Sequence, residues 1–254
     1  MNKLIEYDKE IRLWLHEIKD KINTGEIHIE NVDIKANVRD LVTSVDKSVE
    51  KFLRQKISSR FPNDTIIGEE SYNPKIKMSS ENVWIIDPID ATANFVKQKE
   101  DYAILISYFE NEIPKLSYIY NVFRDELIYA IENIGVFKDE TKILKPNNTS
   151  ISESLVSIDV RKMQGTKIFE KVIEEAFDIR YIGCAGLDGG KVVTGQFGAY
   201  ICPMLQPWDY SPLLLMAREL DLHISDFNGQ PIKFCKRSDV IISTKQFFKD
   251  FIER

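Results

Sequence analysis

The chain has 254 residues, enough for one large domain or two small ones around a sizeable core. Hydrophobic residues make up 43% and charged residues 29%, as in ordinary globular proteins. A net charge of −6 argues against nucleic-acid binding, which depends on basic patches. No apolar run approaches the roughly 20 residues of a membrane helix, and the charged start, MNKLIEYDKE, lacks the apolar centre of a signal peptide. We therefore expect a cytoplasmic protein that binds neither nucleic acid nor membrane.

Cysteine and histidine are too scarce to suggest several common kinds of site. The three cysteines, Cys184, Cys202 and Cys235, show no C-x-x-C spacing, which argues against a disulfide framework and a zinc site. None of the three histidines lies near a plausible nucleophile in the sequence, so a Ser-His-Asp or Cys-His enzyme has little support. Any chemistry would have to come from carboxylates and a metal.

The first half of the chain predicts two helices followed by a sheet. Apolar residues from Leu4 to Ile22 recur at helical spacing, and a polar, irregular stretch continues to about Arg39. The stretch 42–62 predicts a second helix, which ends before Pro62. Short β-branched or aromatic runs then predict consecutive strands of an antiparallel sheet, at 83–87, 103–109, 115–120 and 126–131.

The second half alternates strands and helices after the loop KPNNTS at 145–150. Its expected strands are 154–160, 180–183, 199–202 and 239–244, and its expected helices are about 166–177, 185–195 and 211–220. This alternation predicts a mixed or parallel sheet packed with helices. We therefore predict a layered α/β protein with an N-terminal α+β half, 1–145, and a C-terminal α/β half, 146–254.

The stretch WIIDPIDATANF places two carboxylates at the end of an apolar strand. The strand should end at Asp87, because Pro88 removes a backbone donor and favours an extended residue before it. Asp90 then occupies the position of an N-cap before a short helix. Such a carboxylate pair is unfavourable in a buried turn unless a cation neutralises it, and the amides of Ala91 and Thr92 could bind phosphate. Metal and phosphate together explain the pattern most simply.

Three further segments with acidic residues fit this interpretation. TIIGEES places Glu69 and Glu70 after another apolar run, and QPWDYSP places Asp209 where an N-cap would precede Pro212. Thr43 and Asp46 lie one turn apart on the second helix and should face the same way. Each could be only a helix cap or a solvated loop, but their combination is more specific.

The segments DLVTSVDKSVE, GEES, WIIDPIDATANF and PWDYSP resemble, in order and spacing, the inositol monophosphatase family of magnesium-dependent, lithium-sensitive sugar phosphatases. The resemblance covers about residues 35–212. It implies a five-layer αβαβα sandwich with an antiparallel N-terminal sheet and a mixed or parallel C-terminal sheet. It also implies a homodimer and a small phosphate ester as the substrate.

The family resemblance implies a set of metal ligands. Glu69, Asp87 and the carbonyl of Ile89 would bind a first Mg²⁺, and Asp87, Asp90 and Asp209 a second, with Asp87 bridging. Glu69 would also help to hold a loosely bound third ion. Two ions about 3.5–4 Å apart can activate a water and stabilise a leaving oxygen. Oxygen ligands without histidine favour Mg²⁺ over Zn²⁺.

The resemblance also implies catalytic and phosphate-binding residues. Thr92, with Asp46 behind it, would polarise the attacking water. Glu69 would contribute to catalysis by holding its metal ion. The amides of Ala91 and Thr92 would hold the phosphate. Lys35 aligns with a basic residue of the family's active-site loop, although an ordinary solvated lysine is an equally good interpretation.

The resemblance also implies a leaving-group pocket, whose loop is occupied here by Cys184, Ala185, Gly186 and Asp188, together with Cys202 and the carboxylates of Asp90 and Asp209. In the mammalian enzymes a glutamate contacts the sugar hydroxyls, and its place falls on Cys202. A thiol is a poor hydrogen-bond partner for a polyol, which weakens the case for inositol specificity.

Ala91 is a second departure, because the family usually has glycine at this position. A methyl group is acceptable if φ is negative, as a helix start would provide. We therefore expect a negative φ at Ala91; if the family's glycine takes a positive φ, the phosphate loop must shift, which would affect the catalytic rate but not the metal ligands.

Our leading hypothesis is a Mg²⁺-dependent phosphomonoesterase acting on a small sugar or polyol phosphate such as inositol 1-phosphate. A nucleotide substrate, either the 2′-phosphate of NADP or a 3′-phosphoadenosine nucleotide, is the alternative. Arg161, Lys162 and Arg180 are candidates for its second anionic group, although each could be a plain surface charge. A non-catalytic phosphate-binding relative is less favoured. Ala91, Ala93 and Cys202 suggest it, but the complete set of carboxylates argues against it.

Overall fold

The computed structural model describes residues 2–28, 32–34, 41–73, 81–159, 162–163 and 167–253. Lys35 and Arg161 lie outside the described residues. Seven helices are found in these ranges: α1 (Asn2–Asn23), α2 (Ser44–Arg60), α3 (Thr92–Lys97), α4 (Lys167–Glu175), α5 (Ala185–Val193), α6 (Pro207–Glu219) and α7 (Lys245–Ile252). None of the helices in the described ranges is both long and apolar enough to cross a bilayer.

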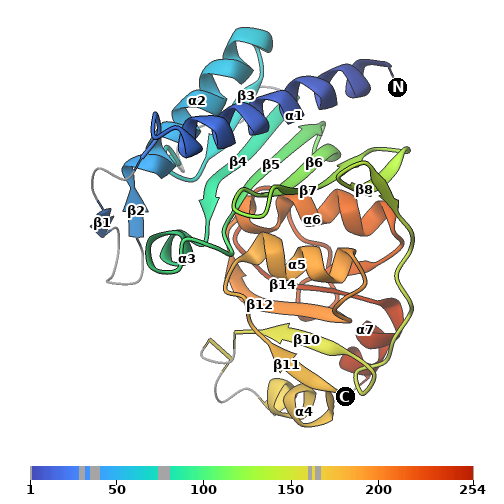
Figure 1. Ribbon diagram of the computed structural model, residues 1–254. Coiled ribbons are helices and arrows are strands. Elements are labelled where there is room, and N and C mark those ends of the chain that lie inside the picture. Colours follow the sequence, from blue (N-terminus) through green and yellow to red (C-terminus); the bar gives the residue numbers. More distant parts are fainter. Residues whose placement is uncertain are drawn as a thin grey trace.

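The helices and sheets stack as five alternating layers (Figure 1). Helices α1 and α2 cover the outer face of one sheet, α5 and α6 lie between the two sheets, and α4 and α7 cover the outer face of the other. Burial of apolar side chains between the layers, at about 25 cal/mol per Å², is the main stabilising contribution. The predicted αβαβα sandwich is confirmed.

The first sheet has seven strands in the order β3-β4-β5-β6-β7-β8-β9. Their bounds are β3 (Thr65–Gly68), β4 (Asn82–Asp90), β5 (Ala103–Glu110), β6 (Ile113–Asn121), β7 (Glu126–Ile131), β8 (Gly135–Lys138) and β9 (Thr141–Ile143). Strands β4 to β7 pair antiparallel, as predicted, and β8 and β9 continue this pattern. The predicted antiparallel arrangement does not extend to β3, which pairs parallel to β4. Neighbouring parallel strands end at the same edge, so this pairing brings the residues after Gly68 beside the end of β4.

The second sheet has the order β11-β10-β12-β14-β13. Its strands are β10 (Leu155–Ile158), β11 (Asp178–Arg180), β12 (Ala199–Leu205), β13 (His223–Ser225) and β14 (Ser238–Ser243). The strand β10 pairs parallel to β11 and β12, whereas β14 pairs antiparallel to β12 and β13. The predicted mixed sheet is confirmed. A separate antiparallel pair, β1 (Val32–Ile34) and β2 (Leu41–Thr43), precedes α2.

The strand β4 does not stop at Asp87 as predicted but continues to Asp90. Its pairing with β5 shifts register here: Asp87 faces Leu105 and Asp90 faces Ala103, so three steps on one strand match two on the other. This bulge accommodates Pro88, which cannot donate to the sheet. Leu105 and Ala103 both belong to the core between the sheets. The bulge therefore turns both carboxylates towards the same face.

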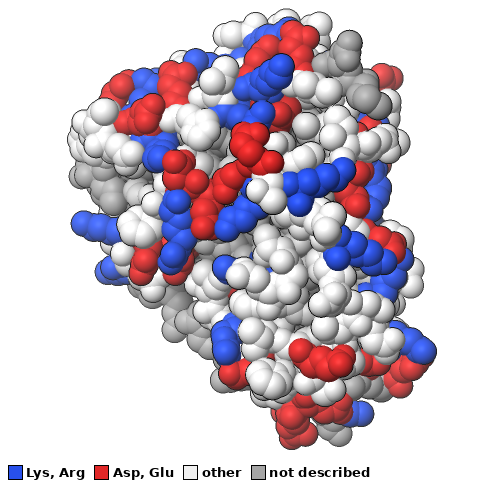
Figure 2. All heavy atoms as spheres, turned by 45° about the vertical axis from the view of Figure 1, so that its right-hand side comes forward, with Lys and Arg blue, Asp and Glu red and all other residues white. Residues whose placement is uncertain are grey.

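Figure 2 shows charged side chains of both signs intermingled over the upper part of this face, above an area that is mostly uncharged. The protein also has ion pairs between helices; for example, Arg60 on α2 contacts Glu6 and Glu10 on α1. Exposed pairs of this kind contribute little stability, at most about 1 kcal/mol each. The packing of α1 against α2 and the sheet therefore depends mainly on apolar residues such as Leu15 and Leu53.

Candidate active site

Four carboxylates from separate elements meet at the edge where β3 and β4 end. Asp87 and Asp90 lie on the bulged end of β4, Glu69 follows β3, and Asp209 is in the first turn of α6. Asp87 is 2% exposed and shares a hydrogen bond with Glu69. Burial, and then the charges of the other three carboxylates, raise the pKa of Asp87 well above its usual value. The structure thus brings together the four acidic residues predicted from the sequence.

The same surroundings raise the pKa of Asp90 to about 6 and that of Asp209 well above the ordinary range. Burial is the first cause for both residues, and nearby negative charge adds to it. A hard cation would relieve this repulsion, and an all-oxygen donor set fits Mg²⁺. Within the described part of the chain, no three Asp, Glu, His or Cys side chains already stand in a ligand arrangement around one point.

Asp90 is held by the start of α5 in the middle layer. One of its carboxylate oxygens accepts the Gly186 N–H at 2.6 Å and faces the Cys184 thiol at 3.1 Å; the other accepts the Ala185 N–H at 3.3 Å. The prediction that Asp90 caps the following short helix is wrong, because the residue before α3 is Ala91. Asp90 instead meets the positive end of α5, where a carboxylate is favoured.

The two predicted pocket residues Cys184 and Ala185 therefore face a carboxylate. Cys184 is fully buried, and burial raises its pKa well above the usual thiol value.

Asp188 fixes the turn that leads into α5; the sequence places it in the pocket loop without indicating a specific role. Its buried carboxylate accepts the Ser157 hydroxyl at 2.6 Å, the Gly183 N–H at 3.0 Å and the Ile182 N–H at 3.2 Å. The available signal was an acidic residue in the first turn of an expected helix. Through this turn, Asp188 sets the position of the donors that hold Asp90.

Asp209 lies at the third position of α6, and the prediction that it is the N-cap is wrong. The helix begins at Pro207, Gln206 is the N-cap residue, and Pro212 lies inside the helix. The carboxylate of Asp209 accepts the Gln206 N–H at 2.8 Å, which satisfies one of the unpaired donors at the helix start.

Thr92 and Asp46 form a hydrogen-bonded pair between α3 and α2. The Thr92 hydroxyl lies 3.0 Å from one Asp46 oxygen, and the other Asp46 oxygen accepts the Thr43 N–H at 2.8 Å and the Thr43 hydroxyl at 2.5 Å. Thr43 and Asp46 therefore lie on the same side, as predicted, but Thr43 is the N-cap at the end of β2 and forms a capping box with Asp46 at the start of α2. This box holds the fully buried Asp46 with its free oxygen directed at Thr92.

Ala91 adopts the left-handed conformation, with φ 69° and ψ 53°. The expected negative φ is wrong and the positive-φ alternative holds for Ala91, because the chain must turn sharply between the bulged strand β4 and α3. Left-handed backbone costs a residue with a Cβ about 1–2 kcal/mol, whereas glycine adopts it readily. The methyl group is therefore accommodated with backbone strain.

We expect Ala91→Gly to raise the free energy of unfolding by about 1 kcal/mol, because it relieves this strain. Ala93→Gly, the same change inside α3, should lower it by up to about 1 kcal/mol. Urea unfolding of both variants measures the difference. A loss of stability in Ala91→Gly equal to that of its control would contradict the left-handed conformation.

Cys202 and Lys162 lie next to Asp209. Cys202 is 3% exposed, and the Lys162 ammonium lies 3.9 Å from its sulfur. Burial raises the pKa of Cys202 to about 11, and the charge of Lys162 opposes that rise. Lys162 also acts to lower the pKa of Asp209, so its charge reaches the carboxylate cluster. Arg180, by contrast, pairs with Asp178 on β11 at 2.6 Å.

The sequence and the fold both match known proteins. The inositol monophosphatase family matches residues 10–253. An inositol-1-monophosphatase of Bacillus subtilis is 32% identical over 100% of this chain and 97% of its own length. A solved staphylococcal IMPase-I with bound products superposes with a TM-score of 0.92 at 33% identity, over 98% of this chain and 94% of that one. An IMPase/NADP phosphatase complexed with Mg²⁺ and phosphate superposes with a TM-score of 0.94 at 33% identity, over 99% of this chain and 95% of that one. The chain therefore belongs to the inositol monophosphatase family of metal-dependent phosphatases.

Proposed function

We propose that this protein is a Mg²⁺-dependent phosphomonoesterase that hydrolyses a small sugar or polyol phosphate of the inositol 1-phosphate type. The main support is the cluster of four carboxylates, of which Asp87, Asp90 and Asp209 have pKa values raised by burial and by each other. Such a cluster is strongly destabilising unless cations or protons neutralise it. A solved relative at 33% identity was crystallised with Mg²⁺ and phosphate.

The proposed ligands are those that the family resemblance implies. Glu69, Asp87 and the carbonyl of Ile89 would hold one ion; Asp87, Asp90 and Asp209 would hold a second; and Glu69 would help with a third. Bound in this way, the ions would supply an activated water and a charge that stabilises the leaving oxygen. The hydrogen bonds from the start of α5 would keep Asp90 in place for this task.

Thr92 and Asp46 would orient the attacking water. Because the Thr92 hydroxyl donates towards Asp46, its oxygen is left to accept a hydrogen bond from a water on the other side. This direction favours removal of a proton from the water, which is the task of a general-base relay. The amides of Ala91 and Thr92 at the turn before α3 would hold the phosphate oxygens.

A nucleotide phosphate such as NADP is the second candidate substrate. Lys162 places a cation beside Cys202 and Asp209, where it could meet a second anionic group. A solved relative described as an IMPase/NADP phosphatase was crystallised with NADP and Ca²⁺, and it superposes with a TM-score of 0.93. A thiol at Cys202 also gives little support for binding a polyol.

Family membership supports three further proposals: a homodimer, inhibition by lithium, and a cytoplasmic location. We also propose the division into 1–145 and 146–254. Under that division Asp209 reaches the site from the second half, and the other three carboxylates come from the first.

Phosphate release from a substrate panel tests the function. The panel contains inositol 1-phosphate, fructose 1,6-bisphosphate, NADP and 3′-phosphoadenosine 5′-phosphate, each with Mg²⁺ and with EDTA as the blank. We expect Mg²⁺-dependent release, fastest with inositol 1-phosphate. Faster release from NADP would select the nucleotide class. Equal rates with Mg²⁺ and with EDTA would contradict the proposal.

A further inference from the structure

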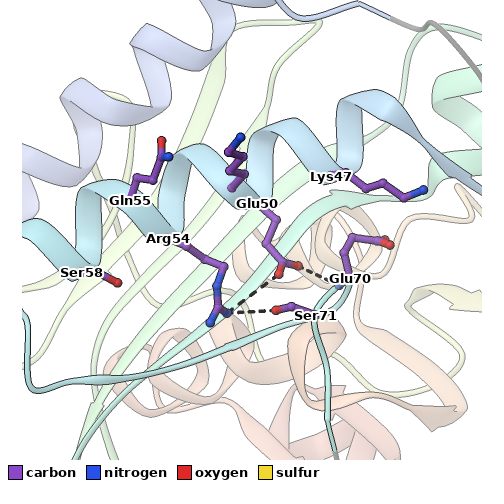
Figure 3. A pocket seen from close by; sticks show the side chains of 8 residues that line it. Lys47, Glu50, Arg54, Gln55, Ser58, Glu70 and Ser71 are labelled. Carbon is purple, nitrogen blue, oxygen red and sulfur yellow. Dashed lines mark hydrogen bonds and ion pairs between the residues drawn. The ribbon is translucent and has the colours of Figure 1, made fainter.

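The loop that carries Glu69 is tied to α2 by a buried carboxylate. Glu50 lies on α2 and is only 3% exposed. One of its oxygens accepts the Glu70 N–H at 2.7 Å, as Figure 3 shows. The peptide bond directly after Glu69 is therefore held by a charged acceptor, and hydrogen bonds to charged groups are stronger than neutral ones.

Arg54, one turn further along α2, adds a second attachment. Its guanidinium lies 3.9 Å from Glu50 and donates to the Ser71 hydroxyl at 3.0 Å (Figure 3). It also donates to the Ile66 carbonyl in β3 at 3.3 Å. Arg54 thereby compensates the buried charge of Glu50 and connects the strand and the loop to the same helix face.

Gly68 shows how closely Glu50 covers this backbone. A Cβ at Gly68 would lie 2.4 Å from the carboxyl carbon of Glu50, a distance that atoms do not tolerate. On the other side, the Glu69 N–H donates to the Ile86 carbonyl of β4 at 3.1 Å. The backbone of Glu69 is thus fixed on one side by the sheet and immediately afterwards by Glu50.

The helix α2 connects two parts of the proposed site. Asp46, one turn before Glu50, contacts Thr92, whereas Glu50 holds the loop of Glu69. Two residues four apart lie on the same helix face, about 6 Å apart along the axis. The spacing between the proposed water-orienting pair and the proposed ligand Glu69 is therefore set by one rigid element.

We propose that Glu50 is a positioning residue that places the Glu69 carboxylate and thereby sets the affinity for Mg²⁺, without touching ion or substrate. The inference rests on the proposed function, in which Glu69 is a ligand. Groups that orient metal ligands typically change metal affinity by about 10- to 100-fold when they are removed. An effect of the Glu50 charge alone on Mg²⁺ affinity is a weaker explanation, because the positive charge of Arg54 already lies beside Glu50.

The test measures Mg²⁺ binding by titration calorimetry on the full chain, together with kcat, substrate KM and the Mg²⁺ needed for half-maximal phosphate release. Glu50→Ala should raise the Mg²⁺ dissociation constant about 10-fold or more, with little change in substrate KM at saturating Mg²⁺. Glu50→Gln keeps an acceptor for the Glu70 N–H and should recover most of the affinity. Gln55→Ala, an exposed change on the same helix, is the control and should bind Mg²⁺ like the unmutated protein.

The outcomes separate this inference from the proposed function. Unchanged Mg²⁺ affinity in Glu50→Ala, or an equal loss in Gln55→Ala, overturns the role of Glu50 and leaves the function standing. An unmutated protein that binds no Mg²⁺ overturns the function itself. If Glu50→Ala fails to fold, Ser71→Ala removes only the exposed attachment to Arg54 and should weaken Mg²⁺ binding about threefold. Unchanged affinity in that variant also overturns the inference.

Discussion

Asp90→Asn is expected to lower Mg²⁺-dependent phosphate release by about 10³-fold or more, which corresponds to roughly 4 kcal/mol of activation free energy. The change removes a charge and a proposed ligand oxygen, but it keeps the shape and one acceptor oxygen. That oxygen can still accept the Gly186 N–H, so the link to α5 should survive. Phosphate release at several Mg²⁺ concentrations measures the loss.

The fold of Asp90→Asn can be checked independently of its activity. Removing one of several repelling carboxylates should leave the stability without Mg²⁺ equal or higher. The increase in unfolding temperature caused by Mg²⁺ should shrink, because ligand binding stabilises the folded state in proportion to affinity. Asp221→Asn is the matched control: Asp221 lies between Lys145 and Lys245, and its change should leave the rate unchanged. A fully active Asp90→Asn would refute the proposed second ion site.

Local patterns in the sequence were sufficient to find the acidic residues but not to predict their partners. An apolar run followed by Asp or Glu predicts a carboxylate at a strand end, and this holds for Glu69, directly after β3, whereas β4 continues past Asp87 and ends at Asp90. The parallel pairing that brings them together depends on where β3 docks, which strand periodicity does not encode. Similarly, the position before a short helix suggested that Asp90 caps α3, whereas its partners lie 94 to 96 residues further along the chain.

Two errors concern backbone conformation, and in both cases the local sequence does not determine the conformation that the chain adopts. Pro207 and Pro212 are both compatible with a first helical position, and the preference for proline there cannot choose between them. The conformation of Ala91 depends on the bulge around Pro88, which changes the direction of the chain before α3. Propensity for a left-handed residue points to Gly or Asn rather than Ala, so only the tertiary structure reveals it. Such local conflicts with propensity are expected at functional sites.

Asp46→Asn is expected to lower phosphate release by about 10²-fold, within the range of general acid–base catalysis. The asparagine can keep its oxygen towards the Thr43 N–H, which preserves the cap of α2. Its amide group would then face Thr92 and donate where the carboxylate accepted, so the Thr92 hydroxyl would keep only the Ile89 carbonyl, at 3.2 Å, as an acceptor. The fold is retained while the polarity of the relay is reversed.

Thr92→Val and the double variant show whether the two residues act as one unit. Thr92→Val should lower the rate of phosphate release by about as much as Asp46→Asn. The double variant should lower this rate only a little further, because removing either partner already breaks the relay. Multiplied losses near 10⁴-fold would mean that the residues act independently. Thr244→Ala is the control for a lost helix cap: it removes the cap of α7 in the outer layer, at a cost of about 1 kcal/mol, and should leave the rate unchanged. With that control, a drop in rate without an equal drop in stability assigns Asp46 to the chemistry rather than to the folding of α2.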